Sequence, residues 1–366
     1  MTATLSNRRP RSSITNAFAD AQLPRLIELW LLLGSAIVVG GALMLVGFNL
    51  AAWAALSAVL YVVAIGVASR LVENGRKAVD RVVRALVTIA FLLAIIPLIS
   101  TLWTVVAQGI GQLNWSFISH TGEAHFDPAT LKVTSVPGAL QAVVGTLEIT
   151  GIATLISVPI GLLTSIYLVE YGLPTSLLRR AVTFLVDVMT GIPSIVAGLF
   201  AFSLFTLIVG PKAFSGLSAS IALSVLMIPI VVRSSEEMLR LVPNELREAS
   251  YALGVSKRHT IAKIVLRTAV SGIVTGVVLA IARVIGETAP IFIAAGFTDN
   301  FNANPLSNPQ QTLAVLAYTG IKFPGHDIAA SNQEAWGAAL LLVILVIIFN
   351  IIARVVASIF APKSGR

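Results

Sequence analysis

The sequence predicts an all-α integral membrane protein, a polytopic bundle of about eight transmembrane helices. Of its 366 residues, 56% are hydrophobic and only 11% are charged, whereas about a quarter of the residues in soluble domains are charged. Several apolar runs reach the roughly 20 residues that a helix needs to cross a bilayer. Lysine and arginine also gather in alternate connecting segments, as the positive-inside rule describes.

The chain begins with a polar, basic segment, 1–25, which predicts a cytoplasmic tail. It is not a cleavable signal peptide, because the apolar run after it is too long. A transmembrane hairpin is expected at 26–70, since only a short connection near 48–50 separates two apolar runs. A six-helix region follows at 84–360, with its core at about 139–360. The expected helices cover 27–48, 50–69, 85–108, 139–169, 181–209, 217–232, 265–296 and 336–360, and the fourth, fifth and seventh are long enough to indicate tilt or breaks.

The distribution of positive charge predicts which side each segment faces. With the tail in the cytoplasm, Lys132, Lys212 and Lys322 fall outside, and Arg283 falls within a helix. All other lysines and arginines fall on the cytoplasmic side, which places both termini there. The net charge of +8 is therefore a topology signal. Nucleic-acid binding is not expected, because the basic residues form no stripe with interleaved aromatic side chains.

Composition also excludes several kinds of chemistry. The chain has no cysteine, and its 4 histidines are scattered without metal-ligand spacing, so neither a thiolate nor a metal site is expected. The phosphate-binding pattern G-x-x-x-x-G-K-[ST] does not occur, so the chain is not expected to bind or hydrolyse ATP. No catalytic residue is proposed.

The longest polar segment on the cytoplasmic side, 233–264, predicts a helix, a glycine turn and a second short helix. Pro243 and Asn244 favour a helix start, and Gly254 favours its end. Ser256 can cap the second helix. From these patterns alone, a plain solvated amphipathic loop is an equally good interpretation.

This loop resembles the EAA signature of ABC-importer permeases. "EASYALG" is followed by "IVL", and Glu248, Ala249 and Gly254 stand at the matching positions. Ser250 replaces the second alanine of the signature, and Arg267 replaces its proline. The resemblance implies that the loop is a coupling helix, which docks into a cleft on an ATPase subunit.

"LREASYALG", "GIPSIVAGLF" and "VSGIVTGVVLAIARVIGETAPIFIAA" together resemble PstA-type permease subunits of phosphate ABC importers, most strongly over 187–297. The resemblance implies a type I permease core in the inner or plasma membrane of a prokaryote, with the hairpin at 27–69 as an addition. It implies a companion permease subunit that completes the pathway, and an ATPase dimer, which holds ATP-Mg, at 233–264. An extracytoplasmic phosphate-binding protein would meet the outer loops, 109–138 and 297–335. The chain itself would bind no cofactor.

Two opposite charges lie inside the seventh expected helix. Arg283 and Glu287 are four residues apart, which places them on one helix face. That face continues through Ala280, Gly276 and Gly272, small residues that allow close helix approach. Either the two charges form a purely structural ion pair, or Arg283 contacts a passing anion while Glu287 balances its charge.

A second charged pair, Arg233 and Glu236, stands at the expected inner end of the sixth helix, after Pro229, which is expected to kink it. Arg283 is 16 residues beyond Arg267, or ~24 Å of helix, in the outer half of the membrane. Resemblance assigns Arg233 to the permeation path, although ordinary positive-inside residues would look the same. The hypothesis is two arginines at different depths on the substrate path, Arg283 outer with Glu287 and Arg233 inner with Glu236, which serve alternate sides of a gate.

Other candidates are weaker. Gly191 and Pro193 in "TGIPSI" free backbone groups that could line a cavity. Asp187 is expected to pair with a nearby arginine, and Glu148 with a partner that the sequence does not name. The possible pathway-lining residues are Asp187, Thr190, Ser194 and Thr288.

Two other functions compete with phosphate import. An arginine fork would also suit sulfate or a molybdate-like oxyanion, so phosphate rests on the resemblance alone. A secondary transporter driven by an ion gradient is less favoured, because the halves show no visible repeat and the acidic residues form no relay.

Overall fold

A computed structural model describes residues 23–24, 26–127, 132–211 and 213–360. The predicted cytoplasmic tail, 1–25, therefore lies outside the described residues except for Leu23 and Pro24. The chain forms two compact units, Met1–Leu102 and Trp103–Arg366. Each is considered by itself.

The N-terminal unit is built from α1 (Ile27–Val46), α2 (Leu50–Val72) and most of α3 (Gly75–Gly109). α1 and α2 form the expected hairpin. Asn49 sets its turn, because its side chain accepts hydrogen bonds from the backbone N–H groups of Ala51 and Ala52 and so caps α2.

A cluster of charged side chains holds the α2–α3 turn. Arg81 donates to both carboxylate oxygens of Glu73, each at 2.8 Å, and to Glu28 at 2.7 Å. The Arg81 guanidinium is the main reason why the pKa of Glu73 is lowered from its ordinary 4.5 to about 2. A lowered carboxyl pKa stabilises the fold above the unfolded value, and this contribution is lost only as the pH falls through the folded value. The turn thus stays charge-paired throughout the neutral and mildly acidic range.

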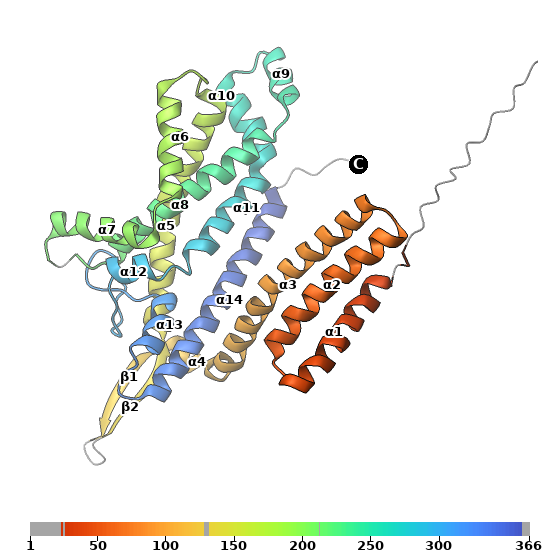
Figure 1. The fold of residues 1–366 in the computed structure, drawn as a ribbon. Coiled ribbons are helices and arrows are strands. Elements are labelled where there is room, and N and C mark those ends of the chain that lie inside the picture. The colour runs from red at the N-terminus through yellow and green to blue at the C-terminus, as the bar shows by residue number, and fades with distance from the viewer. Residues whose placement is uncertain (1–22, 25, 128–131, 212, 361–366) are drawn as a thin grey trace, which may run out of the picture. The chain divides into compact units, whose positions relative to one another are not determined.

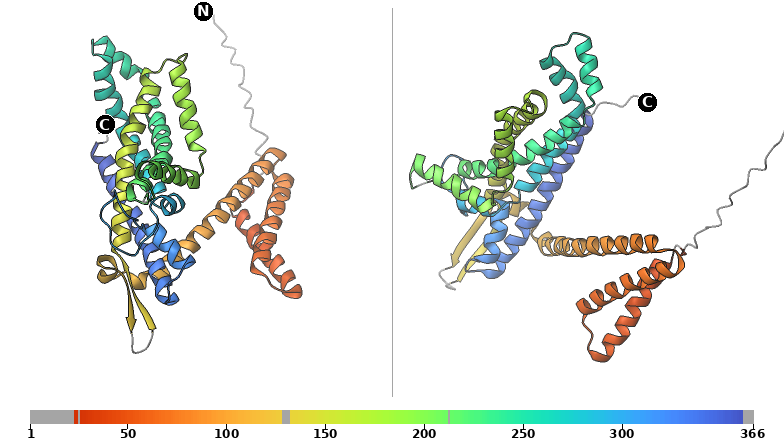
Figure 2. Two further views of the ribbon diagram at one scale, coloured as in Figure 1. Left: turned by 90° about the vertical axis from the view of Figure 1, so that its left-hand side faces the viewer. Right: turned by 45° about the horizontal axis from the view of Figure 1, so that its top comes forward.

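The second unit places four long helices next to one another in the order α5, α8, α11, α14 (Figure 1). The helix α9 (Asn244–Ala252) and the β1–β2 hairpin lie at opposite ends of this unit, and α7 (Ser194–Val209) runs across the direction of the long helices (Figures 1 and 2). Its elements in chain order are a 3₁₀ turn (Ile110–Gln112), α4 (Trp115–Ser119), β1 (Thr121–Asp127), β2 (Lys132–Ala139), α5 (Leu140–Ile166), a π-helical turn η2 (Tyr167–Tyr171), α6 (Leu177–Thr190), α7 (Ser194–Val209), α8 (Gly216–Arg240), α9 (Asn244–Ala252), α10 (Lys257–Thr260), a second π-helical turn η3 (Ile261–Val265), α11 (Leu266–Val284), α12 (Ala289–Ala294), α13 (Leu313–Lys322) and α14 (Ile328–Phe360).

Close helix packing around α8 depends on glycines. A β-carbon on Gly272 would lie 2.3 Å from Sδ of Met238, and one on Gly276 would lie 2.5 Å from Oγ of Ser234. The small-residue strip predicted on α11 is therefore confirmed as a contact with α8. Gly161 of α5 meets α8 in the same way at Val231. Only glycine permits the chains to approach this closely.

Several elements differ from the expectation. The fifth expected span, 181–209, consists of two helices, α6 and α7, bent by 107° at Gly191–Pro193. The sixth helix does not end near residue 232 but continues to Arg240. The second short helix of the loop is not separate, because α10 continues through η3 into α11. Gly191–Pro193 divides the fifth expected helix, whereas α8 continues as a helix through Pro229 and ends before Pro243.

Two connecting segments contain more secondary structure than the sequence indicates. The segment 109–138 contains α4 and the antiparallel pair β1–β2, and 297–335 contains α13 and the start of α14. Within the described ranges, seven helices are long and apolar enough to cross a membrane, or up to eight if the bent pair is counted as one span. The prediction of an all-α membrane bundle with about eight spans is confirmed.

We expect Gly276→Leu to destabilise the bundle by about 1–3 kcal/mol, because the new side chain would overlap Ser234. The measurement is thermal unfolding of the purified chain in detergent. Gly151→Leu on α5 is the matched control, since nothing lies within 4 Å of a β-carbon there. Equal unfolding temperatures for the two variants would contradict the role given to Gly276.

Candidate functional site

Arg233 lies at the centre of an ion-pair network between α6 and α8. Its Nη1 donates to Oε2 of Glu236 at 2.7 Å, and its Nη2 donates to Asp187 of α6. Arg240 donates to the other Glu236 oxygen at 2.5 Å. The arginine expected beside Asp187 is thus Arg233. Because two carboxylates already neutralise it, Arg233 would bind an added anion weakly.

Two helix breaks come together beside this network. α6 ends at Thr190 and α7 starts at Ser194, while α11 ends at Val284 and α12 starts at Ala289. α12 packs on α7 where a β-carbon on Gly198 would lie 2.7 Å from the Cα of Pro290. The structure therefore brings the predicted lining residues Ser194 and Thr288, both half-buried, to neighbouring helix starts.

The prediction that Arg283 and Glu287 share one helix face is wrong. α11 ends at Val284, and Glu287 lies in the following turn, where its backbone N–H donates to the Val284 carbonyl at 3.1 Å. Pro290 explains the break, because it has no N–H for the carbonyl of Gly286 and therefore cannot continue the helix. Among the described residues, no ion pair joins Arg283 to Glu287. A structural i,i+4 ion pair is thereby excluded as the reason for the two charges.

Arg283 lies on an exposed stripe of α11 with Thr275 and Leu279. Gly276 lies against Ser234, the residue next to Arg233. Arg283 is seven residues after Gly276 on α11, so it lies ~10 Å along the helix from the level of Arg233. A groove of about 540 Å³ runs along α8 and along the part of α11 that precedes Arg283. Its lining residues are Ser234, Glu237, Met238, Ser271, Gly272, Thr275, Gly276, Leu279 and Ser358.

Thr190 is exposed, and its hydroxyl donates to the Val186 carbonyl at 2.9 Å, so a ligand would have to compete with this bond.

Glu148 has the partner that the sequence could not name: Gln310 donates to it at 2.6 Å and also to the Asn302 carbonyl at 2.9 Å. Within the described ranges, no group of three or more His, Cys, Asp or Glu side chains could hold a metal ion.

The helix start and the glycine turn of the loop are as its sequence predicts. α9 starts after Pro243, and Gly254 follows its end with φ 74°, a left-handed conformation that favours glycine. Glu248 and Ala249 are exposed. The buried Ser250 bonds Thr260 at 2.8 Å, which closes the turn. The exposed face is therefore the one that carries the signature residues.

Arg247 anchors α9 to the membrane helices, a role that sequence reasoning missed. Its Nη2 lies 2.8 Å from Oε1 of Glu170, and the two side chains are 13% and 6% exposed. It also donates to the carbonyls of Leu239 (3.0 Å) and Val242 (2.6 Å) at the end of α8. Glu170 belongs to η2, which directly follows α5. One buried guanidinium therefore joins α9, α5 and α8.

The only sequence signal for this anchor is Glu170 itself, an acidic residue at the inner end of an apolar run. A second contact supports it, because Nζ of Lys257 lies 4.8 Å from the ring centre of Tyr171. α9 and α10 are thus both in contact with η2, at the end of α5.

These features describe a helical membrane protein with an exposed loop between two of its long helices. The family described as "Binding-protein-dependent transport system inner membrane component" matches residues 157–366, and the chain belongs to this family. It is therefore a multi-pass inner-membrane protein. The recognition made from the EAA signature is confirmed.

Within that family, the chain is similar to phosphate transport permeases. It is 44% identical to "Phosphate transport system permease protein PstA 1" of Mycobacterium tuberculosis, over 73% of this chain and 84% of that protein. It is 37% identical to "Phosphate transport system permease protein PstA" of Haemophilus influenzae, over 76% of this chain and 94% of that protein.

A solved structure of the MetNI methionine ABC transporter, in an inward-facing conformation, shares the fold. Its matching chain is 22% identical with a TM-score of 0.50, and the match covers 61% of this chain and 96% of that chain. The expected ABC-importer permease fold is confirmed.

We expect Arg247→Ala to destabilise the loop region by about 3–5 kcal/mol, because it leaves the buried Glu170 carboxylate unpaired. Thermal unfolding, together with limited proteolysis between α8 and α10, measures the effect. Arg258→Ala, which removes an exposed charge from the same loop, should leave both readouts unchanged. Similar proteolysis of the two variants would show that Arg247 is not the anchor.

Proposed function

We propose that this chain is the permease subunit of an ATP-driven phosphate importer, in which it forms half of the translocation pathway. The observation that carries the proposal is the 44% identity to a phosphate transport permease over 84% of that protein's length. A sulfate or molybdate-like permease is the alternative, since the same guanidinium chemistry suits any tetrahedral oxyanion. A secondary transporter driven by an ion gradient is a more distant one.

Arg283 is the substrate-binding residue in this proposal. It is exposed on α11 and forms no ion pair with any described residue, whereas Arg233 is held by Asp187 and Glu236. An anion would bind more tightly at the unpaired guanidinium than at the neutralised one. Glu287, freed from the helix just beyond Arg283, would limit that affinity so that the anion can leave.

The remaining parts of the transporter come from other chains. ATP-Mg is bound and hydrolysed by an ATPase dimer that docks on α9 at Glu248, Ala249 and Gly254. Arg247 passes the movement of α9 to α5 and α8. A companion permease subunit forms a heterodimer with this chain and completes the pathway, and an extracytoplasmic binding protein delivers phosphate to 109–138 and 297–335. Both termini lie in the cytoplasm.

Arg283→Ala should reduce phosphate uptake by cells to the level of cells that lack the chain, because the pathway loses its unpaired cation. Membrane insertion and co-purification of the ATPase should persist. Arg354→Ala, which removes an exposed charge from α14, is the control. Undiminished uptake by the Arg283 variant would rule out this assignment.

The substrate is tested by the ATPase activity of the reconstituted complex with its binding protein. Phosphate should stimulate hydrolysis, and sulfate at equal concentration should not. Stimulation by sulfate alone would support the alternative oxyanion. Uptake by this chain alone in liposomes, driven by an ion gradient, would overturn the ATP-driven mechanism.

A further inference from the structure

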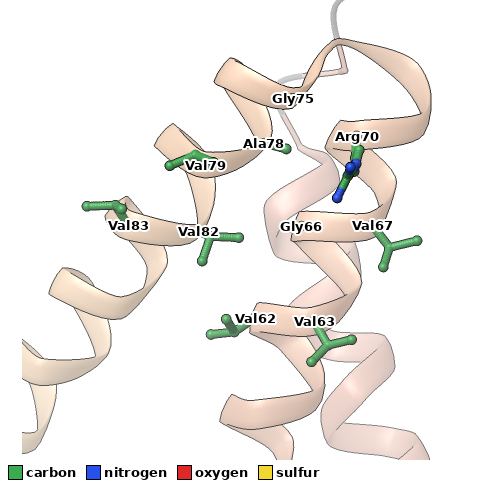
Figure 3. Close-up of a pocket in the computed structure, with 10 residues that line it drawn as sticks. All are labelled: Val62, Val63, Gly66, Val67, Arg70, Gly75, Ala78, Val79, Val82 and Val83. Carbon is green, nitrogen blue, oxygen red and sulfur yellow. The ribbon is translucent and has the colours of Figure 1, made fainter.

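The N-terminal unit carries a groove that the proposed import mechanism does not use. It has a volume of about 580 Å³ and opens between α2 and α3. Figure 3 shows the two helices separating beyond the turn that joins them, with Val62 and Val82 pointing toward each other across the opening. Its one charged lining residue is Arg70. The full lining is Val62, Val63, Gly66, Val67, Arg70, Gly75, Ala78, Val79, Val82 and Val83.

The groove owes its shape to Gly66. A β-carbon there would lie 2.9 Å from Cγ2 of Val82, so the absence of a side chain lets α3 approach α2. Where the helices separate, Val63, Val67 and Val79 are 56%, 53% and 63% exposed. Both helices are long and apolar enough to cross a membrane. The surroundings of these side chains are therefore hydrocarbon, and a lipid chain suits the groove.

The charges near the turn are not all neutralised. Arg81 is held by Glu73 and Glu28, and its side chain is only 20% exposed. Arg70, in contrast, is exposed and forms no ion pair with any residue that the structure describes. Its side chain lies at the end of the groove that is nearest the α2–α3 turn (Figure 3). A positive charge at the end of an apolar groove complements a lipid with an anionic head group.

We propose that this groove binds one acyl chain of an anionic phospholipid and that Arg70 binds the lipid phosphate. A guanidinium can donate two parallel hydrogen bonds to a phosphate. From Val62 to Arg70, α2 rises ~12 Å. The part of the acyl chain nearest the head group therefore lies against the valines, while the lipid phosphate lies at the helix end beside Arg70. The lipid attaches the N-terminal unit to one leaflet of the membrane.

Native mass spectrometry of the full chain in detergent tests the head-group part. Phosphatidylglycerol should bind as one retained lipid, and phosphatidylcholine with the same acyl chains should bind more weakly. Arg70→Gln should weaken phosphatidylglycerol binding about fivefold. Arg84→Gln removes the same charge from a separate polar pocket beside Glu73 and Arg81, and should leave binding unchanged. Equal loss in both variants, or equal binding of both lipids, would overturn the proposal.

The acyl-chain part needs its own variants. Val79→Trp fills the groove and keeps Arg70, so it should also weaken phosphatidylglycerol binding. Val59→Trp, on α2 outside the groove and 62% exposed, is the control and should have no effect. Inorganic phosphate should not compete, and competition would indicate a free-anion site instead. A photocrosslinking residue in place of Val79 should capture lipid; capture of a protein helix would overturn the proposal.

Discussion

The close contact of α8 with α5 and α11 is the constraint on which the second unit depends. Gly161, Gly272 and Gly276 place backbones where side chains would overlap Val231, Met238 and Ser234. In a membrane, apolar side chains gain little by leaving lipid, so tight packing of this kind supplies much of the helix association. α8 is accordingly the most enclosed span, with 61% of its apolar window buried. The network of Arg233 and the anchor of Arg247 both need α8 in this position.

The described arginines discussed above differ in how their charge is paired. Arg81 and Arg247 are enclosed and held by carboxylates, where removing a partner would leave a costly buried charge. Arg70 and Arg283 are exposed and have no carboxylate partner among the described residues. The first kind holds helices together, and the second leaves hydrogen-bonding capacity for something outside the chain. Arg233 is intermediate, since its side chain is 33% exposed although two carboxylates bind it.

Much of this architecture is readable from the sequence, because hydropathy and helix-end signals are local. The spans, the α9 start at Pro243 and the turn at Gly254 follow from residues within a few positions. The features that the sequence did not predict depend on the angle between helices or on contacts between residues far apart in the chain. Gly191 and Pro193 mark a break but do not specify a bend of 107°. Helical spacing places Glu287 beside Arg283, but α11 ends at Val284, before Glu287 and Pro290. Arg247 and Glu170 are 77 positions apart, beyond the reach of any local pattern.

The two π-helical turns have a consequence for how chain length can vary. η2 directly follows α5, and η3 directly precedes α11, at Tyr167–Tyr171 and Ile261–Val265. A π turn holds one residue more than the α turn it replaces. A chain shorter by one residue at either point would therefore close into regular α-helix, and the loop beyond would rotate by about 100°. A single-residue insertion or deletion at η3 would therefore rotate α9 and α10 relative to α11, and one at η2 would rotate α6 relative to α5.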